Sequence, residues 1–138
     1  MIATCQENNG VGISAPQVYR LLRLFIVATK PNPRYPNAPL MEPTAIINPE
    51  ILESSDELED GWEGCLSIPL HGIVSRHKSI RVAYINRSGY RVEQQFDGFI
   101  ARVFQHEFDH IDGVLFVDRA RPVTFCSEEE FAKIPQVH

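Results

Sequence analysis

The segment QHEFDH at residues 105–110 constrains this chain more than any other feature. On a helix, His106 and His110 are one turn apart and point the same way, so both imidazoles can bind one metal ion. Glu107 lies beside them, in position to handle the proton of a water molecule at that metal. The pattern therefore predicts a metal site on a helix. The simpler alternative is a core helix that carries two hydrogen-bonded histidines.

The surrounding sequence supports a helix. Residues 98–112 contain no proline and no internal glycine, and Gly113 follows as a stop signal. At about 100° per residue the segment has three stripes. The polar stripe comprises Arg102, Gln105, Asp109 and Asp112; the apolar stripe comprises Ile100, Phe104, Phe108 and Ile111; the third comprises Phe99, Val103, His106 and His110. We therefore expect a helix that is buried on most sides, with both histidines facing inward.

Length and composition limit the class of protein. The chain has 138 residues, 43% of them hydrophobic and 22% charged, which predicts one domain over residues 1–138 with a substantial core. The net charge of −5 does not support nucleic acid as a partner. The longest apolar stretch, 21–28, contains Arg23 and is too short to span a bilayer. No signal-peptide pattern is visible, and three cysteines in no disulfide framework favour a reducing compartment.

Strand patterns occupy the first half of the chain. Residues 21–29 are apolar and rich in β-formers, which predicts a buried strand. Prolines crowd the region after it, so residues 30–43 should form an extended connection. Residues 44–52 predict a strand interrupted at Asn48-Pro49 and therefore placed at a sheet edge. The acidic residues 54–60 predict a solvated loop.

The other expected elements flank the metal segment. Residues 73–86 and 90–96 predict a hairpin across 87–89. Residues 1–9 resemble the last turns of a helix, and residues 125–134 a final helical turn or two with Ser127 as N-cap.

Glu63 and Arg76 carry opposite charges on either side of Cys65, which predicts an ion pair that braces the cysteine loop. The alternative is two solvated side chains.

A catalytic metal site needs three protein ligands and one open position, and the helix supplies two. The downstream candidates lack the spacing of known zinc peptidases: Asp112, Asp118, Cys126, the glutamates 128–130 and His138. Upstream, Cys65 lies in the constrained segment 62–69. A lone cysteine is by default a small buried hydrophobe, so these arguments alone leave the third ligand open.

Three segments resemble the signature motifs of peptide deformylases, in the right order: GVGISAPQ at 10–17, EGCLS at 63–67 and QHEFDH at 105–110. The first motif alone is weak evidence, whereas the second and third together are highly specific. The resemblance runs through nearly the whole chain. It implies an α+β fold of antiparallel strands packed around a central metal-binding helix. It also implies hydrolytic removal of the formyl group from the N-terminal formylmethionine of new polypeptides.

The resemblance implies a metal site and a general acid/base. By motif position, Cys65, His106 and His110 would bind one divalent metal ion. That ion would be Fe²⁺ natively, with Zn²⁺, Ni²⁺ or Co²⁺ able to occupy the same ligands. Glu107 would be the general acid/base. The partners would be N-formylmethionyl nascent peptides at the ribosome, in a bacterial-type cytoplasm, with an organellar or phage origin left open. Neither nucleic acid nor membrane is expected as a partner.

The resemblance also implies how the substrate is held. The side chain of Gln17 and the backbone N–H of Leu66 would bind the formyl oxygen as it gains charge. The pocket for the methionine side chain has four candidates, two of them on the histidine face of the helix: Val11, Gly12, Phe99 and Val103.

Some features depart from the family pattern. Ser14 stands where alanine is usual, and the chain lacks the strand and most of the helix that usually precede the first motif. Residues 70–75 lack the arginine with which some members hold the substrate peptide. Three other interpretations remain: a zinc endopeptidase, a copper electron-transfer protein with a His₂Cys site, and a non-catalytic metal- or peptide-binding module. The intact Glu107 and Gln17 argue against the last.

Overall fold

The computed structural model describes residues 12–14, 23–31, 38–65, 68–113, 119–120 and 125–127. These residues form eight strands and one helix, in the following order: β1 (Gly12–Ser14), β2 (Leu24–Val27), β3 (Thr44–Ser54), β4 (Leu58–Cys65), β5 (Ile68–His77), β6 (Ser79–Ile85), β7 (Arg91–Asp97), α2 (Gly98–Ile111) and β8 (Cys126–Ser127). Every strand pairing is antiparallel. The predicted α+β fold of antiparallel strands around one helix is confirmed.

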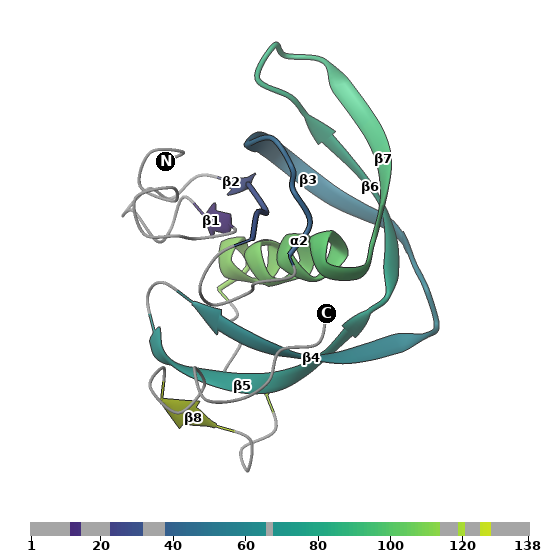
Figure 1. Ribbon diagram of the computed structural model, residues 1–138. Helices are drawn as coiled ribbons and strands as arrows, with labels where there is room; N and C mark the ends of the chain where they lie inside the picture. Colours follow the sequence, from purple (N-terminus) through teal and green to yellow (C-terminus); the bar gives the residue numbers. More distant parts are fainter. Residues whose placement is uncertain are drawn as a thin grey trace.

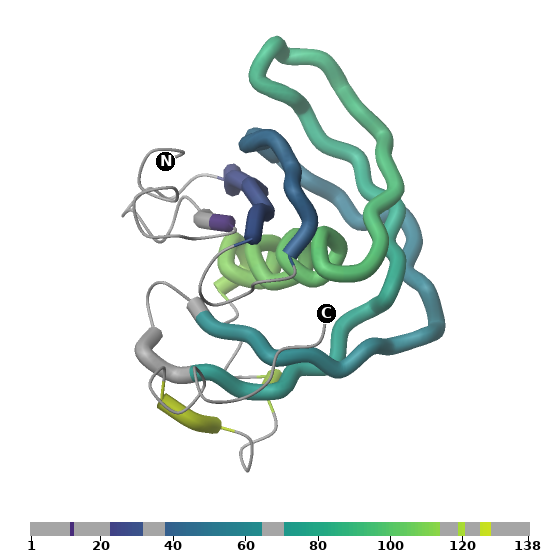
Figure 2. Tube along the Cα trace, viewed as in Figure 1, coloured from purple at the N-terminus to yellow at the C-terminus, as the bar shows by residue number. Residues whose placement is uncertain are grey.

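The strands form two sheets that share the helix. One sheet has the order β1-β2-β3-β6-β7, and the other has the order β4-β5-β8. Helix α2 contacts strands of both sheets and lies at the centre of the molecule (Figure 1). Figure 2 shows the chain passing from β3 into β4 and returning from β5 into β6. The two sheets are therefore joined by continuous chain on one side of α2.

The main core lies between α2 and the five-stranded sheet. Phe104 is fully buried on the sheet-facing side of the helix. Its ring meets Phe25 of β2 edge-on at 5.0 Å between centroids, and Phe96 of β7 at 5.7 Å. Ile46 and Val82, from the two central strands, complete the same cluster. This packing fixes the rotation of α2 about its axis and so decides where its other faces point.

The predicted helix and its stop are confirmed. The helix ends at Ile111, and Gly113 follows with φ of 81°, a conformation that glycine adopts without strain. The predicted polar stripe is largely buried against β4 and β5. Gln105 shows how it is satisfied, because its side-chain amide donates to the carbonyl of His77 at 2.8 Å and accepts from the N–H of His77 at 3.0 Å.

Strand β3 is interrupted as predicted, but it is not an edge strand. It pairs with β2 on one side and β6 on the other. The ladder to β6 shifts register between Ile47 and Glu50, and Asn48 there has φ of 48°. The bulge lifts Pro49 out of the regular ladder, so its missing N–H leaves no gap in the hydrogen bonding. A proline interruption is therefore compatible with a central strand.

The predicted strand 73–86 divides into two. Residues up to His77 belong to β5 in the smaller sheet, and residues from Ser79 belong to β6 in the larger one. Lys78 forms the bend between them, and its carbonyl accepts from Gly98 N–H at 2.9 Å. The hairpin of β6 and β7 across 87–89 is confirmed. A pattern of strand-like residues cannot show that the chain changes sheets.

Two further predictions need correction. The solvated loop 54–60 is exposed as expected, but Leu58–Asp60 already belong to β4. Within the segment 125–134, where a final helical turn was expected, Cys126 and Ser127 instead pair with β5 as strand β8, and residues 128–134 lie outside the described residues. Cys126 packs with Trp62 and Phe99 around Ala38, which gives it a structural role. The predicted helix over 1–9 lies outside the described residues.

Candidate metal centre

Two imidazoles converge on the inward face of α2. His106 and His110 are both buried, and their Nε2 atoms are 3.2 Å apart. Two nitrogens that share one metal at bond lengths of about 2.0–2.1 Å are separated by about 3.3 Å in tetrahedral geometry. Glu107 lies with them, and one ligand atom from each of the three residues falls within 4.8 Å of the others. The spacing predicted from the helical period is therefore realised.

The second nitrogen of His106 identifies its tautomer. Nδ1 lies 2.9 Å from Oε1 of Glu63, which is at the end of β4. An ionised carboxylate can only accept, so Nδ1 carries the proton and Nε2 presents its lone pair to the site. Histidines that bind metals usually donate their other N–H to such a carboxylate, which fixes the ring orientation. Glu63 therefore prepares His106 to act as a ligand.

Glu63 itself is held by two arginines. Arg76 of β5 donates from Nε and Nη2 to its two oxygens, each at 2.9 Å, and Arg102 of α2 donates from Nη1 at 2.6 Å. Burial alone would raise the pKa of Glu63, but the hydrogen bonds from Arg76 and His106 and the positive charge of Arg76 lower it well below its ordinary value. The carboxylate is therefore a permanent acceptor. The predicted ion pair between Glu63 and Arg76 is confirmed, and both partners are buried.

The ion pairs continue to the far end of the helix. Arg76 also donates from Nη1 to Asp109 at 2.6 Å. Arg119 donates to both oxygens of Asp109, at 2.6 and 3.1 Å. Burial would lower the pKa of Arg76, but Glu63 and Asp109 raise it. Charged side chains of β4, β5 and α2 thus form one buried network next to the histidines. We call Glu63, Arg76, Arg102 and Asp109 the buried ion network; Arg119, whose side chain is 49% exposed, contacts it from outside through Asp109.

Strand β1 closes the site on another side. Gly12 is buried, and a Cβ atom at this position would lie 2.9 Å from both Val103 Cγ1 and Glu107 Cγ. Those distances are too short for a real Cβ, so only glycine lets the strand approach the helix this closely. The structure therefore brings together Gly12, Val103 and Glu107, which were predicted from separate motifs.

The remaining predicted residues are placed differently. The backbone of Cys65 ends β4, two residues after Glu63, and its side chain lies outside the described part of the structure. Val11, Gln17 and Leu66 also lie outside the described residues. Phe99 is on the first turn of α2, where it packs against Ala38 and lines a cavity at the start of the helix.

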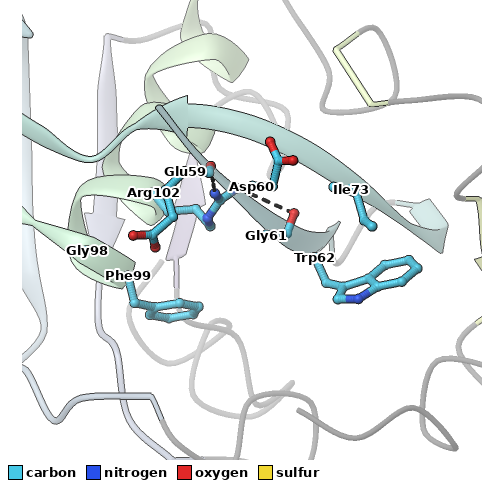
Figure 3. A pocket seen from close by; sticks show the side chains of 8 residues that line it. All are labelled: Glu59, Asp60, Gly61, Trp62, Ile73, Gly98, Phe99 and Arg102. Carbon is cyan, nitrogen blue, oxygen red and sulfur yellow. Dashed lines mark hydrogen bonds between the residues drawn. The ribbon is translucent and has the colours of Figure 1, made fainter. Parts of the chain in front are cut away.

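That cavity has a volume of about 610 Å³ and lies between β4 and the start of α2. Figure 3 shows the rings of Phe99 and Trp62 on the same side of β4, with Arg102 held against the strand. Its lining combines aromatic rings, backbone and charged groups: Glu59, Asp60, Gly61, Trp62, Ile73, Gly98, Phe99 and Arg102. Cavities with a few polar groups on a largely apolar wall are typical ligand sites.

The sequence pattern predicted only part of the buried ion network. Arg102 and Asp109 were recognised only as members of a polar stripe. A polar stripe on a helix that is otherwise apolar indicates that charges will be buried. It does not identify the partners of Arg102, which lie 28 to 43 residues away in the chain.

Sequence comparisons match the chain to known proteins. A match to the polypeptide deformylase family covers residues 1–125. Peptide deformylase 2 of Nostoc sp. is 54% identical over 136 residues, which are 97% of this chain and 76% of that protein. Peptide deformylase 2 of Shewanella oneidensis is 49% identical over 122 residues, 88% of this chain and 67% of that protein.

Solved structures of similar sequence share the fold. A class I type b peptide deformylase from Acinetobacter baumannii, crystallised with Met-Ala-Ser bound, has a TM-score of 0.84 at 54% identity and covers 86% of this chain and 76% of its own. The enzyme from Thermotoga maritima has a TM-score of 0.77 at 46% identity, covering 88% and 77%. Among the described residues, no helix is long and apolar enough to cross a membrane.

Proposed function

The chain belongs to the polypeptide deformylase family, and from this premise we propose that Cys65, His106 and His110 hold its metal ion. The protein removes the formyl group from the N-terminal formylmethionine of new polypeptides and releases formate. The observation that carries the proposal is the convergence of two Nε2 atoms 3.2 Å apart, with the Nδ1 of His106 anchored on Glu63.

The donor set fits a divalent transition metal. Two imidazoles and a thiolate suit Fe²⁺, Zn²⁺, Ni²⁺ or Co²⁺ and do not suit Mg²⁺ or Ca²⁺, which prefer oxygen ligands. We propose Fe²⁺ as the native metal. Cys65 follows Glu63 at the end of β4, on the strand that already contacts α2 through the buried ion network. The metal supplies Lewis acidity that brings the pKa of water close to neutrality.

Glu107 is the proposed general acid/base. It takes a proton from the attacking water and then delivers a proton to the leaving amine nitrogen of the peptide. Its burial beside the two histidines and against Gly12 supports this role, because proton transfer requires the carboxylate within hydrogen-bonding reach of the reacting atoms. Glu63 cannot take the same role, since it accepts from four nitrogens at once.

Two donors are proposed for the formyl oxygen. Attack on the formyl carbon moves negative charge onto this oxygen, and preorganised N–H donors stabilise it. The side chain of Gln17 and the backbone N–H of Leu66 are the proposed donors, and Leu66 directly follows the ligand Cys65. Removal of one such donor commonly costs about 3–4 kcal/mol of barrier.

The peptide is expected to bind in an extended pose along β1. Among the described strands, β1 pairs only with β2, so its other edge can take up a further strand, and the face of β1 at Gly12 packs against Glu107. The proposed pocket for the methionine side chain comprises Val11, Gly12, Val103 and Phe99, of which Phe99 also lines the cavity of about 610 Å³. The bound Met-Ala-Ser of the Acinetobacter baumannii enzyme is consistent with such a pocket.

The size of the acyl group should decide whether a peptide reacts. A formyl carbon carries only hydrogen, whereas the methyl of an acetyl group would crowd the proposed metal, Gln17 and Cys65. A misplacement of about 1 Å can cost roughly a hundredfold in rate. Matched formyl-Met and acetyl-Met peptides should therefore differ by at least about that factor in kcat/KM, and similar values would contradict a site built around a formyl group.

Elemental analysis tests the ligand set. Wild-type protein should contain one metal ion per chain, and Cys65→Ala and His110→Ala should lose it. Cys126→Ala is the matched control, because Cys126 belongs to an apolar cluster on β8. Full occupancy in both ligand variants would contradict the assignment. We propose that the reaction takes place on nascent peptides at the ribosome in the cytoplasm, because the substrate is a new polypeptide that still carries its formyl group.

A further inference from the structure

Arg102 is shared by two parts of the molecule. It donates to Glu63 Oε2 at 2.6 Å, to Val74 O at 2.9 Å and to Glu59 O at 2.5 Å. Its side chain is only 7% exposed, yet it forms part of the wall of the 610 Å³ cavity (Figure 3). One guanidinium therefore joins β4 and β5 to the helix and also shapes the cavity.

The backbone of β4 is adapted to this guanidinium. A Cβ at position 61 would lie 2.8 Å from both Cζ and Nε of Arg102, which no side chain could tolerate without displacing it. The Gly61 carbonyl lies 3.5 Å from Nη1. The arginine thus rests on bare backbone at Gly61, and its position is defined by strand geometry as much as by its charge partner.

The same arginine reaches the metal centre through one carboxylate. Arg102 and His106 are one helical turn apart on α2, and they contact opposite oxygens of Glu63: Arg102 contacts Oε2 and His106 Nδ1 contacts Oε1. Displacement of Arg102 removes one of the two hydrogen bonds from arginines to Oε2. Glu63 stays bound to Arg76 through both oxygens, but it can shift along that contact, and His106, which donates to Oε1, would shift with it.

We propose that Arg102 is a positioning residue that also determines specificity: it couples the shape of the cavity to the orientation of His106. The inference rests on the proposed function, because it takes the cavity as the site of the first side chain of the substrate. A side chain that fits the cavity leaves Arg102 on Gly61 and His106 aligned. A substrate side chain that displaces the guanidinium weakens its own binding and also disturbs the metal centre. Poor substrates therefore have a lower kcat as well as a lower affinity.

The test uses the full metal-loaded chain and two substitutions. Arg102→Leu removes every hydrogen bond of the guanidinium, whereas Arg102→Lys keeps the charge but cannot reach Glu63, Val74 and Glu59 together. Two quantities are measured: the rate at which a chelator extracts the metal, and kcat and KM for formyl peptides that begin with methionine, alanine or phenylalanine. Arg81→Leu is the matched control, since Arg81 is an exposed arginine of β6 that lies outside both the buried ion network and the lining of the cavity.

We expect Arg102→Leu to speed metal extraction about tenfold or more, and to reduce the preference for methionine over alanine and phenylalanine mainly through kcat. Arg102→Lys should be intermediate, and Arg81→Leu should keep the wild-type preference and extraction rate. If Arg102→Leu does not fold, Gly61→Ala displaces the guanidinium from the opposite side and should give the same two changes. Wild-type preference and extraction rate in Arg102→Lys and Gly61→Ala would overturn the coupling. An inactive or metal-free wild type would instead contradict the proposed function.

Discussion

At the scale of single residues, the centre contains two buried glutamates with different environments. Glu63 receives four hydrogen bonds from two arginines and His106, which keep it ionised. Glu107 lies on the other side of the histidines, against the backbone of Gly12. Carboxylates in one site commonly divide their tasks according to their surroundings. Glu63 suits the task of orienting His106, and Glu107 suits proton transfer.

The substitution Glu107→Gln separates these tasks. The amide keeps the size of the side chain but cannot accept and return a proton, so turnover should fall by about 10²- to 10⁴-fold. Both histidines remain, so metal content should match that of the wild type. Turnover and elemental analysis of the same sample check both expectations. Glu53→Gln, at an exposed position of β3, is the control. Near-normal turnover in Glu107→Gln would show that another group moves the proton.

The sequence was most informative where a local period governs geometry. The separation of His106 and His110 follows from the helical period, and the helix end follows from Gly113. The contact of His106 with Glu63 spans 43 residues of chain, and it depends on how β4 packs on α2. Opposite charges at Glu63 and Arg76 suggested one part of the network. The partners of Arg102 could not be predicted in this way, because they include the backbone carbonyls of two strands.

At the scale of elements, the residue pattern predicted the positions of strands along the chain better than their order in the sheets. Alternation continues through residues 73–86, but Lys78 bends the chain from one sheet into the other. The interruption at Asn48-Pro49 was predicted correctly, but the prediction that its strand lies at a sheet edge was wrong. Sheet order is set by pairings between distant strands, such as β3 with β6, and no local period records these.

Asn48 provides a test of the bulge in β3. Its φ of 48° lies in the left-handed region, which asparagine and glycine tolerate and β-branched residues do not. Asn48→Val should therefore reduce the free energy of unfolding by about 1–2 kcal/mol, whereas Asn48→Gly should change it little. Denaturant titration of the metal-loaded protein measures both. Glu50→Val is the control, as it introduces the same side chain at an exposed position of β3. Equal effects of the two valines would mean that the conformation of Asn48 carries no strain.

At the scale of the whole molecule, α2 is attached to its two sheets by different means. Apolar packing around Phe104 joins it to the five-stranded sheet. Its attachment to β4 and β5 relies on charged and polar contacts of Arg102, Gln105 and Asp109. Buried ion pairs contribute less net stability than their number suggests, because each charge has lost its hydration. The three-stranded sheet is therefore the part whose attachment should depend most on the metal.

Metal removal should reveal this difference. With ligands on α2 and, as proposed, at Cys65 on β4, the metal links the smaller sheet to the helix. A metal present at about 100 times its Kd stabilises the folded state by about 2.7 kcal/mol, which corresponds to roughly 10 °C in Tm for a domain of this size. Chelation should lower Tm by about that amount, and restored metal should reverse the change. In His110→Ala, chelation should have little further effect.

Hydrogen exchange of the same samples locates the loss of stability. Amides of β4 and β5 should lose protection on chelation, whereas those of β6 and β7 should keep most of theirs, because the cluster around Phe96 and Phe104 does not involve the metal. A loss spread evenly over both sheets would show that the molecule opens as one unit. An unchanged pattern in β4 would contradict a ligand at Cys65, even if both histidines bind the metal.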